Sequence, residues 1–316
     1  MLKKVHLFIV LGLLIALLAA CGQSASTTES SATGEASSKV KTENGTITHT
    51  ADARVASLSI HVTNNLLALG IQPVGSVVGG DVKDFLPHVA DQLQGTTKLG
   101  TVDDPDMEAL LALNPDVIYV DQTYAGTDLS KYEKIAPTIS INMDEGTWQD
   151  HLKQIAGHIG LTDKADAFIK EYTQKADEVS TLIHSKLGEN AKVMAIRATA
   201  KELRVMSTAR PLGPIMYTDL KLQAPDMVKQ ISTDEPFAVV SKEVLPDYNA
   251  DAIFVIISKG NEAQATFDEL EKNPVWQNLK AVKEKHVYML DGQKWLDYSS
   301  LGHRMALDDA EKLFSN

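Results

Sequence analysis

Because the chain of 316 residues contains a single cysteine, Cys21, no disulfide can form within it, and its own hydrophobic core has to hold the fold together. Basic residues are also scarce, since 30 Lys and Arg stand against 42 Asp and Glu. The net charge of −12 and the lack of any basic run argue against a nucleic-acid partner. The sequence also lacks G-x-S-x-G, G-x-G-x-x-G, P-loop and H-E-x-x-H motifs, so we expect no enzyme activity.

Clusters of metal ligands are also missing from the sequence. The nine histidines form no histidine-rich tract and no closely spaced ligand pair. His151 and His158 share one face of an expected helix, but they lie too far apart along it to chelate one ion. Residues 103–108 lack the glycine and the ligand spacing of an EF-hand loop. We therefore expect no metal site and no cofactor of the protein's own.

Long apolar runs are confined to the N-terminus. Lys3 and Lys4 precede an apolar run that ends at Ala20, and this run is short for a membrane span, which needs about 20 apolar residues. A basic start, a short apolar run and small residues before a cleavage point are typical of an export signal, predicted over residues 1–20. The sequence LAAC that ends at Cys21 resembles a bacterial lipobox, which implies cleavage before Cys21 and a lipid attached to it. The alternative is an ordinary signal peptide with a chance cysteine.

The segment after the lipobox is poor in large apolar side chains. Residues 22–45 are rich in Ser, Thr, Gly and Glu, and Val40 is the one apolar side chain there that is larger than alanine. Such a composition cannot bury a core. We therefore expect a flexible tether over residues 21–50, which would let a lipid-anchored protein work at the outer face of a cell membrane.

From about residue 53, short β-rich runs alternate with helical stretches, which favours an α/β fold with mostly parallel sheets. Residues 163–188 contain no proline or glycine until their end, and apolar side chains recur there every three or four positions. This spacing predicts one amphipathic helix, a rod of roughly 37 Å. The alternation then begins again. We expect two Rossmann-like lobes, residues 51–162 and 189–316, joined by this helix and with a ligand cleft between them.

One phrase of the sequence occurs twice. The run MEALLALNPDVIYV at 107–120 aligns with KEVLPDYNADAIFV at 242–255, and a glutamate falls at the same place in both. We expect a helix that leads into a buried strand in each lobe, with Glu108 and Glu243 in the first helical turns. Acidic residues there can simply favour the helix dipole. Alternatively, two equivalent carboxylates on one exposed face can be recognised by a partner with two symmetric basic sockets.

Together these features resemble the substrate-binding lipoproteins of ABC importers, in particular the ferric-siderophore and cobalamin class. The resemblance covers nearly the whole chain, and EKNPVWQNLKAVKEKHVYML at 271–290 is its most specific piece. It implies that Glu108 and Glu243 dock onto arginines of a permease dimer. It further implies a lipid-anchored monomer at the extracytoplasmic face of the cell membrane, with stiff lobes that close only slightly on a ligand.

Ligand contacts are expected in the loops that follow the strands, because ligands of open α/β sheets gather beyond the carboxyl ends of the strands. Arg197 stands at the end of an apolar strand, and Arg210 lies in the loop before the next helix. The family often has a ligand-contacting arginine in the strand of Arg197, and guanidinium groups suit carboxylate, hydroxamate or catecholate oxygens. The alternatives are a salt bridge for Arg197 and a solvated charge for Arg210.

Four further side chains are candidate ligand contacts. Trp295 and Tyr298 follow the last strand, where the resemblance implies aromatic rings against the organic shell of a siderophore. Their alternative role is to pack the C-terminal helix onto its lobe. Tyr124 and His61 lie in loops that follow earlier strands.

The predicted ligand is a ferric siderophore for iron uptake, whose iron is coordinated by the siderophore alone. Some family members carry a second arginine two residues after the first, but Thr199 stands at that position. A citrate-type or hydroxamate siderophore is therefore favoured over a tris-catecholate. Haem or cobalamin is the alternative ligand, because Tyr124 or His61 could supply the axial ligand that haem requires.

Overall fold

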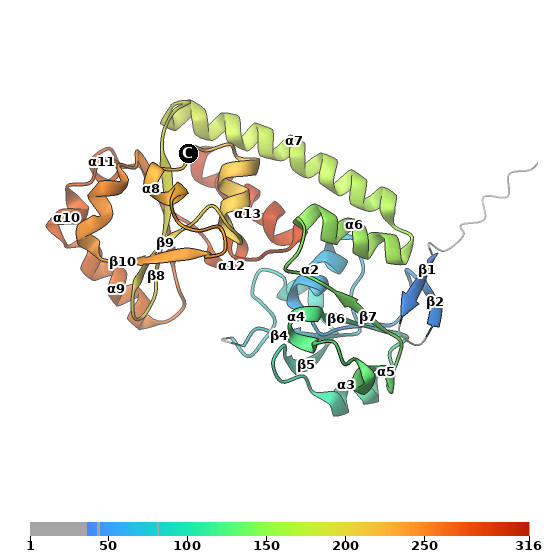
Figure 1. Ribbon diagram of the computed structural model, residues 1–316. Helices are drawn as coiled ribbons and strands as arrows, with labels where there is room; N and C mark the ends of the chain where they lie inside the picture. The colour runs from blue at the N-terminus through green and yellow to red at the C-terminus, as the bar shows by residue number, and fades with distance from the viewer. Residues whose placement is uncertain (1–36, 43–44, 81, 316) are drawn as a thin grey trace, which may run out of the picture. The chain divides into compact units, whose positions relative to one another are not determined.

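The computed structural model describes residues 37–42, 45–80 and 82–315, which form two α/β lobes and one long helix that joins them (Figure 1). The sheet of the N-terminal lobe has five parallel strands. In spatial order they are β5 (Thr97–Thr101), β4 (Gly75–Val78), β3 (Val55–Ser57), β6 (Val117–Asp121) and β7 (Thr138–Ile141). Counted along this lobe, the order is 3-2-1-4-5, which is that of a doubly wound sheet.

The sheet of the C-terminal lobe has five strands in the same order. They are β10 (Phe237–Val240), β9 (Leu203–Met206), β8 (Val193–Ala198), β11 (Ala252–Ile257) and β12 (Val287–Met289). Strands β8, β11 and β12 run parallel, whereas β9 is antiparallel to both of its neighbours. The predicted α/β fold with two similar lobes is confirmed.

Helices connect the strands of both sheets. The N-terminal lobe contains α2 (Ile60–Ala68), η1 (Ala90–Leu93), α3 (Met107–Leu113), α4 (Gln122–Ala125), α5 (Ser130–Glu133) and α6 (Trp148–Ile159). The helical segments of the C-terminal lobe are mostly shorter: η2 (Pro214–Asp219), α8 (Asp226–Lys229), η3 (Lys242–Tyr248), α9 (Asn261–Glu271), α10 (Pro274–Gln277), α11 (Lys280–Lys283) and α12 (Gly292–Trp295). The phrase at 271–290 thus contains two short helices, α10 and α11, before β12.

The repeated phrase forms equivalent elements in the two lobes. Asn114 ends α3 and Asn249 ends η3, both in the left-handed conformation with φ of 47° and 46°. Asparagine adopts this conformation more easily than most residues, so it suits a helix C-terminus. The repeat of asparagine therefore has a local structural cause.

The repeated aspartate also has the same structural role in each lobe. The Asp116 carboxylate accepts the backbone N–H of Arg54 at 2.8 Å, next to the start of β3. The Asp251 carboxylate likewise accepts the backbone N–H of Lys192 at 2.7 Å, next to the start of β8. Each aspartate thus fixes the start of its strand against the first strand of the lobe.

The long helix α7 spans Thr162–Leu187, and its 26 residues confirm the predicted helix. Its buried side chains follow the predicted spacing, and they are Ala165, Tyr172, Ala176, Val179, Ser180 and Ile183. All of them except Ser180 join one hydrophobic core that draws residues from both lobes. One face of the helix is therefore packed against the core, and the helix is not a solvated linker.

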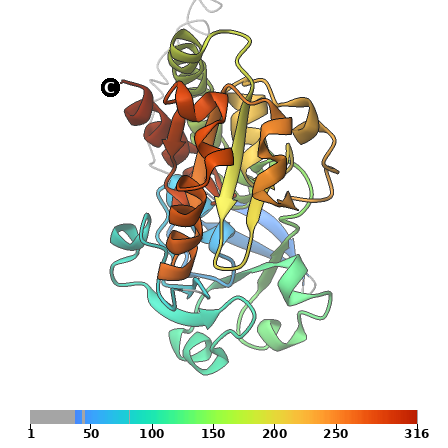
Figure 2. The ribbon, with the colours of Figure 1, turned by 90° about the vertical axis from the view of Figure 1, so that its left-hand side faces the viewer.

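The last helix, α13 (Ser300–Ser315), lies beside α7 in both ribbon views (Figures 1 and 2). It also packs against α2 of the N-terminal lobe. At its first residue, the backbone N–H and the hydroxyl of Ser300 both donate to the buried Asn65 side-chain oxygen, at 3.1 and 2.6 Å. The start of α13 thus contacts the N-terminal lobe, whereas its last turn lies in the C-terminal lobe, where Phe314 stacks on Tyr288.

The prediction of a flexible tether up to residue 50 was wrong for its last part. Strands β1 (Ser37–Thr42) and β2 (Gly45–Thr50) form an antiparallel hairpin that packs against α6. Val40 and His49 are buried in this contact. The β-branched residues and the Asn44-Gly45 pair are hairpin signals, which the Ser- and Thr-rich composition obscured.

The predicted export signal, the lipidated Cys21 and the tether up to residue 36 lie outside the described residues. Among the residues that the structure describes, no helix is both long and apolar enough to span a bilayer.

A hydrogen bond between two titratable side chains fastens α7 to the C-terminal lobe. The Tyr172 hydroxyl donates to the Asp219 carboxylate at 2.6 Å, at the end of η2. Burial raises the pKa of Asp219 to about 6, although the hydrogen bond from Tyr172 opposes this shift. The folded protein therefore holds a proton on Asp219 at pH values where the unfolded chain has already released it.

This proton predicts a pH trend for Asp219→Asn. Between about pH 4 and pH 6 the folded state binds more protons than the unfolded state at this site, so Asp219 lowers the stability as the pH rises. Asparagine can still accept the Tyr172 hydroxyl but does not titrate. We expect the free energy of unfolding of the variant, relative to the wild type, to increase from pH 4 to pH 7 in urea titrations. The exposed Asp247→Asn is the matched control, and an identical trend in both variants would contradict the assignment.

Candidate functional site

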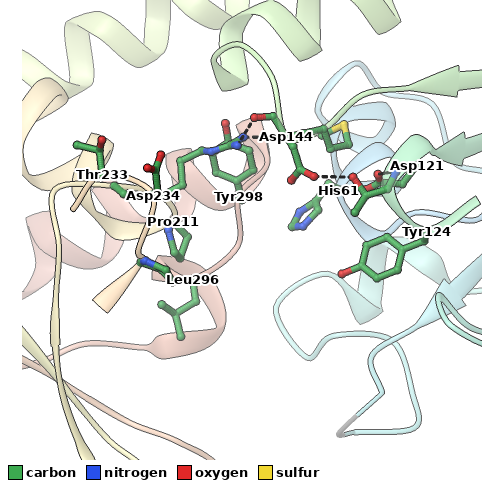
Figure 3. A pocket seen from close by; sticks show the side chains of 14 residues that line it. His61, Asp121, Tyr124, Asp144, Pro211, Thr233, Asp234, Leu296 and Tyr298 are labelled. Atoms are coloured by element: carbon green, nitrogen blue, oxygen red, sulfur yellow. Dashed lines mark hydrogen bonds between the residues drawn. The ribbon is translucent and has the colours of Figure 1, made fainter. Parts of the chain in front are cut away.

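Two adjoining cavities lie between the lobes. The first, with a volume of about 430 Å³, is termed the acidic cavity because Asp121, Asp144 and Asp234 are among its lining residues (Figure 3). The second, with a volume of about 590 Å³, is termed the basic cavity because Arg197 and Lys259 line it. Leu296 lines both cavities, so they are two halves of one cleft.

Each cavity lies at the point where the strand order of one sheet reverses. His61 follows β3 and Asp121 ends β6, and both line the acidic cavity. Arg197 belongs to β8 and Ser258 follows β11, and both line the basic cavity. Carboxyl ends of neighbouring strands at such a switch point form the usual ligand crevice of open α/β sheets. The cleft is therefore where the sequence predicted it.

Arg197 lines the basic cavity, as predicted. Its Nε donates to the Ser258 hydroxyl at 2.8 Å, which links the ends of β8 and β11. The side chain is partly exposed, whereas the rest of β8 is buried. This placement keeps the guanidinium at the cavity surface, and its contact with a ligand stays a prediction.

Arg204 was missed by the sequence analysis. It stands directly opposite Arg197 across the β8–β9 pair, so the two side chains share one face of the sheet. Its Nε donates a hydrogen bond to the Glu202 carboxylate at 2.7 Å, and its guanidinium lies 4.0 Å from the centre of the Phe237 ring. Two β-rich runs separated by a short polar turn were the available signal for this pairing.

Arg210 bridges the two lobes at the wall of the acidic cavity. Its Nη1 donates to the Met143 carbonyl at 2.8 Å, and its Nη2 donates to the Asp144 carbonyl. The guanidinium also lies 4.4 Å from the centre of the Tyr298 ring. The structure thus brings Arg210 and Tyr298 together, as cleft residues, but it engages Arg210 with backbone carbonyls rather than leaving all its donors to a ligand.

The other wall of the acidic cavity carries Tyr124, Asp121 and His61 (Figure 3). Tyr124 is 57% exposed, which makes it available to a ligand. Asp121 is buried, and burial raises the pKa of its carboxyl despite the hydrogen bond it accepts from the Thr123 N–H at 3.0 Å. Tyr124 and His61 therefore lie in the cleft as predicted, and Asp121 is an addition that the sequence did not single out.

A buried carboxylate behind this cavity joins the lobes. Asp297 accepts the Asn64 amide at 2.7 Å, and its carboxylate lies 2.9 Å from His88 Nε2 and 3.8 Å from His61 Nδ1. Burial would raise the pKa of Asp297, but the hydrogen bond from His88 and the charges of His61 and His88 hold it well below its usual range. Its partners stand more than 200 positions away in the sequence, so no local pattern marked it.

The prediction that Trp295 contacts the ligand was wrong. Its side chain is fully buried, it packs edge-on against Phe254, and its indole N–H donates to the Asp309 carboxylate at 2.8 Å. The alternative that the sequence left open, packing of the C-terminal helix onto its lobe, is what the structure shows, because Asp309 belongs to α13.

Glu108 and Glu243 are exposed in the first turns of α3 and η3. Asp106 caps α3 by accepting the Ala109 N–H at 2.9 Å, so the first of these helices has a capping carboxylate without Glu108. The exposed Glu243 carboxylate accepts hydrogen bonds from its own backbone N–H and from Ser241, which lower its pKa, so it also supports the start of η3. The role of both glutamates in docking stays a prediction.

No group of three or more His, Cys, Asp or Glu side chains converges on a common point that could hold a metal ion within residues 37–42, 45–80 and 82–315. The carboxylates and the imidazole of the acidic cavity are therefore spread over its walls rather than gathered as a metal site.

Several known proteins are similar to this chain in sequence and in fold. The chain is 30% identical to an iron-uptake system-binding protein of Bacillus subtilis (strain 168), over 91% of this chain and 90% of that protein. It is 31% identical to the iron(3+)-hydroxamate-binding protein FhuD of the same organism, over 88% and 87%. The crystal structure of Staphylococcus aureus SirA complexed with staphyloferrin B matches with a TM-score of 0.73 at 25% identity, covering 88% of this chain and 98% of SirA.

The family assignment rests on most of the chain. Residues 55–294, which run from the start of β3 to α12, match the periplasmic binding protein family. This segment contains both sheets, the long helix and most of the cleft. The chain belongs to the periplasmic binding protein family.

Proposed function

We propose that the protein is an extracytoplasmic binding protein that captures a ferric siderophore and delivers it to an ABC importer for iron uptake. The interlobe cleft carries this proposal, because two adjoining cavities at the switch points of both sheets offer room for a bulky chelate. The names of the relatives, which include iron-uptake, hydroxamate-binding and staphyloferrin B-binding proteins, support the ligand class.

A hydroxamate siderophore suits the charges of the cleft best. Arg197 and Lys259 are the cations among the described residues of the basic cavity, and Arg210 is already engaged with backbone carbonyls. A ferric tris-catecholate carries several negative charges and would call for more cations. A ferric tris-hydroxamate core is neutral, so this small basic set is sufficient, and a citrate-type chelate lies between the two in charge.

The N-terminal segment would hold the protein at the membrane. After removal of residues 1–20, a lipid on Cys21 would anchor it, and residues 21–36 would serve as the tether. The folded part would act as a monomer at the extracytoplasmic face. Glu108 and Glu243, one on each lobe, would then dock onto the permease dimer.

Titration calorimetry with the chain from residue 22 onward tests the ligand class. We expect submicromolar binding of a ferric hydroxamate and weaker binding of ferric citrate and of a ferric tris-catecholate. Calorimetry is preferable to tryptophan fluorescence because all three tryptophans are buried. Binding of haemin or cobalamin in place of every siderophore would overturn the proposal.

Arg197→Ala should weaken binding of the ferric hydroxamate by more than about tenfold, because charge-assisted hydrogen bonds to the chelate are lost. Circular dichroism should show an unchanged fold. The matched control is Arg304→Ala, which removes a guanidinium that pairs with Asp308 on α13, outside both cavities. An unchanged affinity in Arg197→Ala would remove this residue from the site.

The double variant Glu108→Ala with Glu243→Ala should bind the ligand normally and fail to support uptake of radioactive iron by cells. Both carboxylates are exposed and line neither cavity, so their loss should leave ligand binding unchanged. Because Glu243 also accepts hydrogen bonds at the start of η3, circular dichroism checks that the variant is folded. Glu262→Ala is the control, since Glu262 is also exposed in the first turn of a helix, α9. Normal uptake by the double variant would assign both glutamates to the helix dipole.

A further inference from the structure

The two halves of the cleft carry opposite charge. Three carboxylates line the acidic cavity, and they belong to Asp121, Asp144 and Asp234. The described residues of the basic cavity include Arg197 and Lys259 and no carboxylate. A ligand that extends past Leu296 and fills both halves of the cleft therefore meets cations at one end and carboxylates at the other.

Arg210 does not neutralise these carboxylates through ion pairs. Its donors are directed to the backbone carbonyls of Met143 and Asp144, and its face lies on the Tyr298 ring. Among the described residues, no ion pair within 4.0 Å joins a lysine or arginine to Asp121, Asp144 or Asp234. The acidic cavity thus keeps an excess of negative charge.

Two of the carboxylates are held close together by one residue. Thr123 donates its backbone N–H to Asp121 at 3.0 Å and its hydroxyl to Asp144 at 2.5 Å. Asp121 is 96% buried, as its exposed fraction is 4%, and this burial raises the pKa of its carboxyl. The hydrogen bond from Thr123 and the charge of His61 oppose the rise in pKa, and the charge of Asp144 adds a smaller contribution to it. A buried carboxylate beside a like charge is unfavourable unless a cation compensates it.

Aromatic rings complete the surroundings of this carboxylate pair. Figure 3 shows Tyr124 and Asp121 on one wall and Tyr298 and Asp234 on the other. Aromatic faces attract organic cations, and carboxylates attract them more strongly. The face of Tyr298 is already covered by the Arg210 guanidinium, so the exposed Tyr124 is the ring available to an organic cation. Tyr124 and the carboxylates therefore supply the two kinds of group that recognise an ammonium ion, and the carboxylates are too dispersed to enclose a bare metal ion.

We propose that the acidic cavity binds a protonated amine arm of the ligand, while the basic cavity receives the oxygens of the ferric chelate. This inference rests on the proposed function and narrows its ligand class to ferric hydroxamates that keep a free primary amine. A carboxylate-rich or catecholate chelate of the same size would place negative charge against Asp121 and Asp144 and would be selected against.

Calorimetry with two forms of one chelate tests this inference. Ferrioxamine B carries a pendant primary amine that is protonated at neutral pH, and its N-acetylated form has the same iron-binding groups without that charge. We expect the wild type to bind ferrioxamine B about tenfold more tightly than the N-acetylated form, because the ammonium group then meets the buried carboxylate of Asp121 beside the exposed carboxylates of Asp144 and Asp234. The ratio of the two affinities is the quantity of interest.

Substitution of the carboxylates should remove this preference. In Asp121→Asn the ratio should fall toward one, and Asp234→Asn, at an exposed position, gives a second variant whose folding is not at risk. Arg304→Ala, outside both cavities, should keep the ratio of the wild type. Thermal unfolding monitored by circular dichroism checks that each variant is folded.

The outcomes separate the inference from the proposed function. Equal binding of the two forms by the wild type would overturn the amine subsite and leave the siderophore function standing. A preference that persists in both carboxylate variants would also overturn it. Binding of neither form would contradict the hydroxamate ligand itself, and the inference would fall with it.

Discussion

The buried carboxylate of Asp297 fixes the two lobes relative to each other, and the shape of the cleft depends on this contact. Its partners Asn64, His61 and His88 all belong to the N-terminal lobe, whereas Asp297 precedes the last helix. A buried charge that lost such partners would cost roughly 3–5 kcal/mol. Beside it, the hydroxyl of Ser300 donates to Asn65, so two consecutive asparagines of α2 fasten the C-terminal segment.

Four consecutive residues next to this junction have four different roles. Trp295 is anchored in the core through Phe254 and Asp309, and Leu296 lines both cavities. Asp297 turns back to the N-terminal lobe, and Tyr298 forms a wall of the acidic cavity under Arg210. Because one short segment makes the core, the junction and the cleft, any change in lobe packing would also change the site. The packed helix α7 and the Arg210 bridge add to this stiffness.

The sequence identified the elements that depend on local pattern, and it failed where long-range packing decides. The spacing of apolar residues predicted α7, and the repeated phrase predicted equivalent helix–strand units in both lobes. The hairpin at residues 37–50 was missed because composition outweighed its turn signal. Trp295 was misplaced because a residue after a strand can face either the cleft or the core, and only the packing of α13 fixes which.

The sequence by itself determined the fold class, the long helix, the position of the cleft at the strand ends and the presence of Arg197 there, because periodicity and strand ends are local properties of the chain. Tertiary structure alone decided that Arg210 spans the lobes, that Arg204 stands opposite Arg197, and that three carboxylates line the walls of one cavity. Asp121 and Asp234 are more than 100 positions apart. Only the packing of one lobe against the other places such charges face to face, and that packing depends on contacts throughout the hydrophobic core.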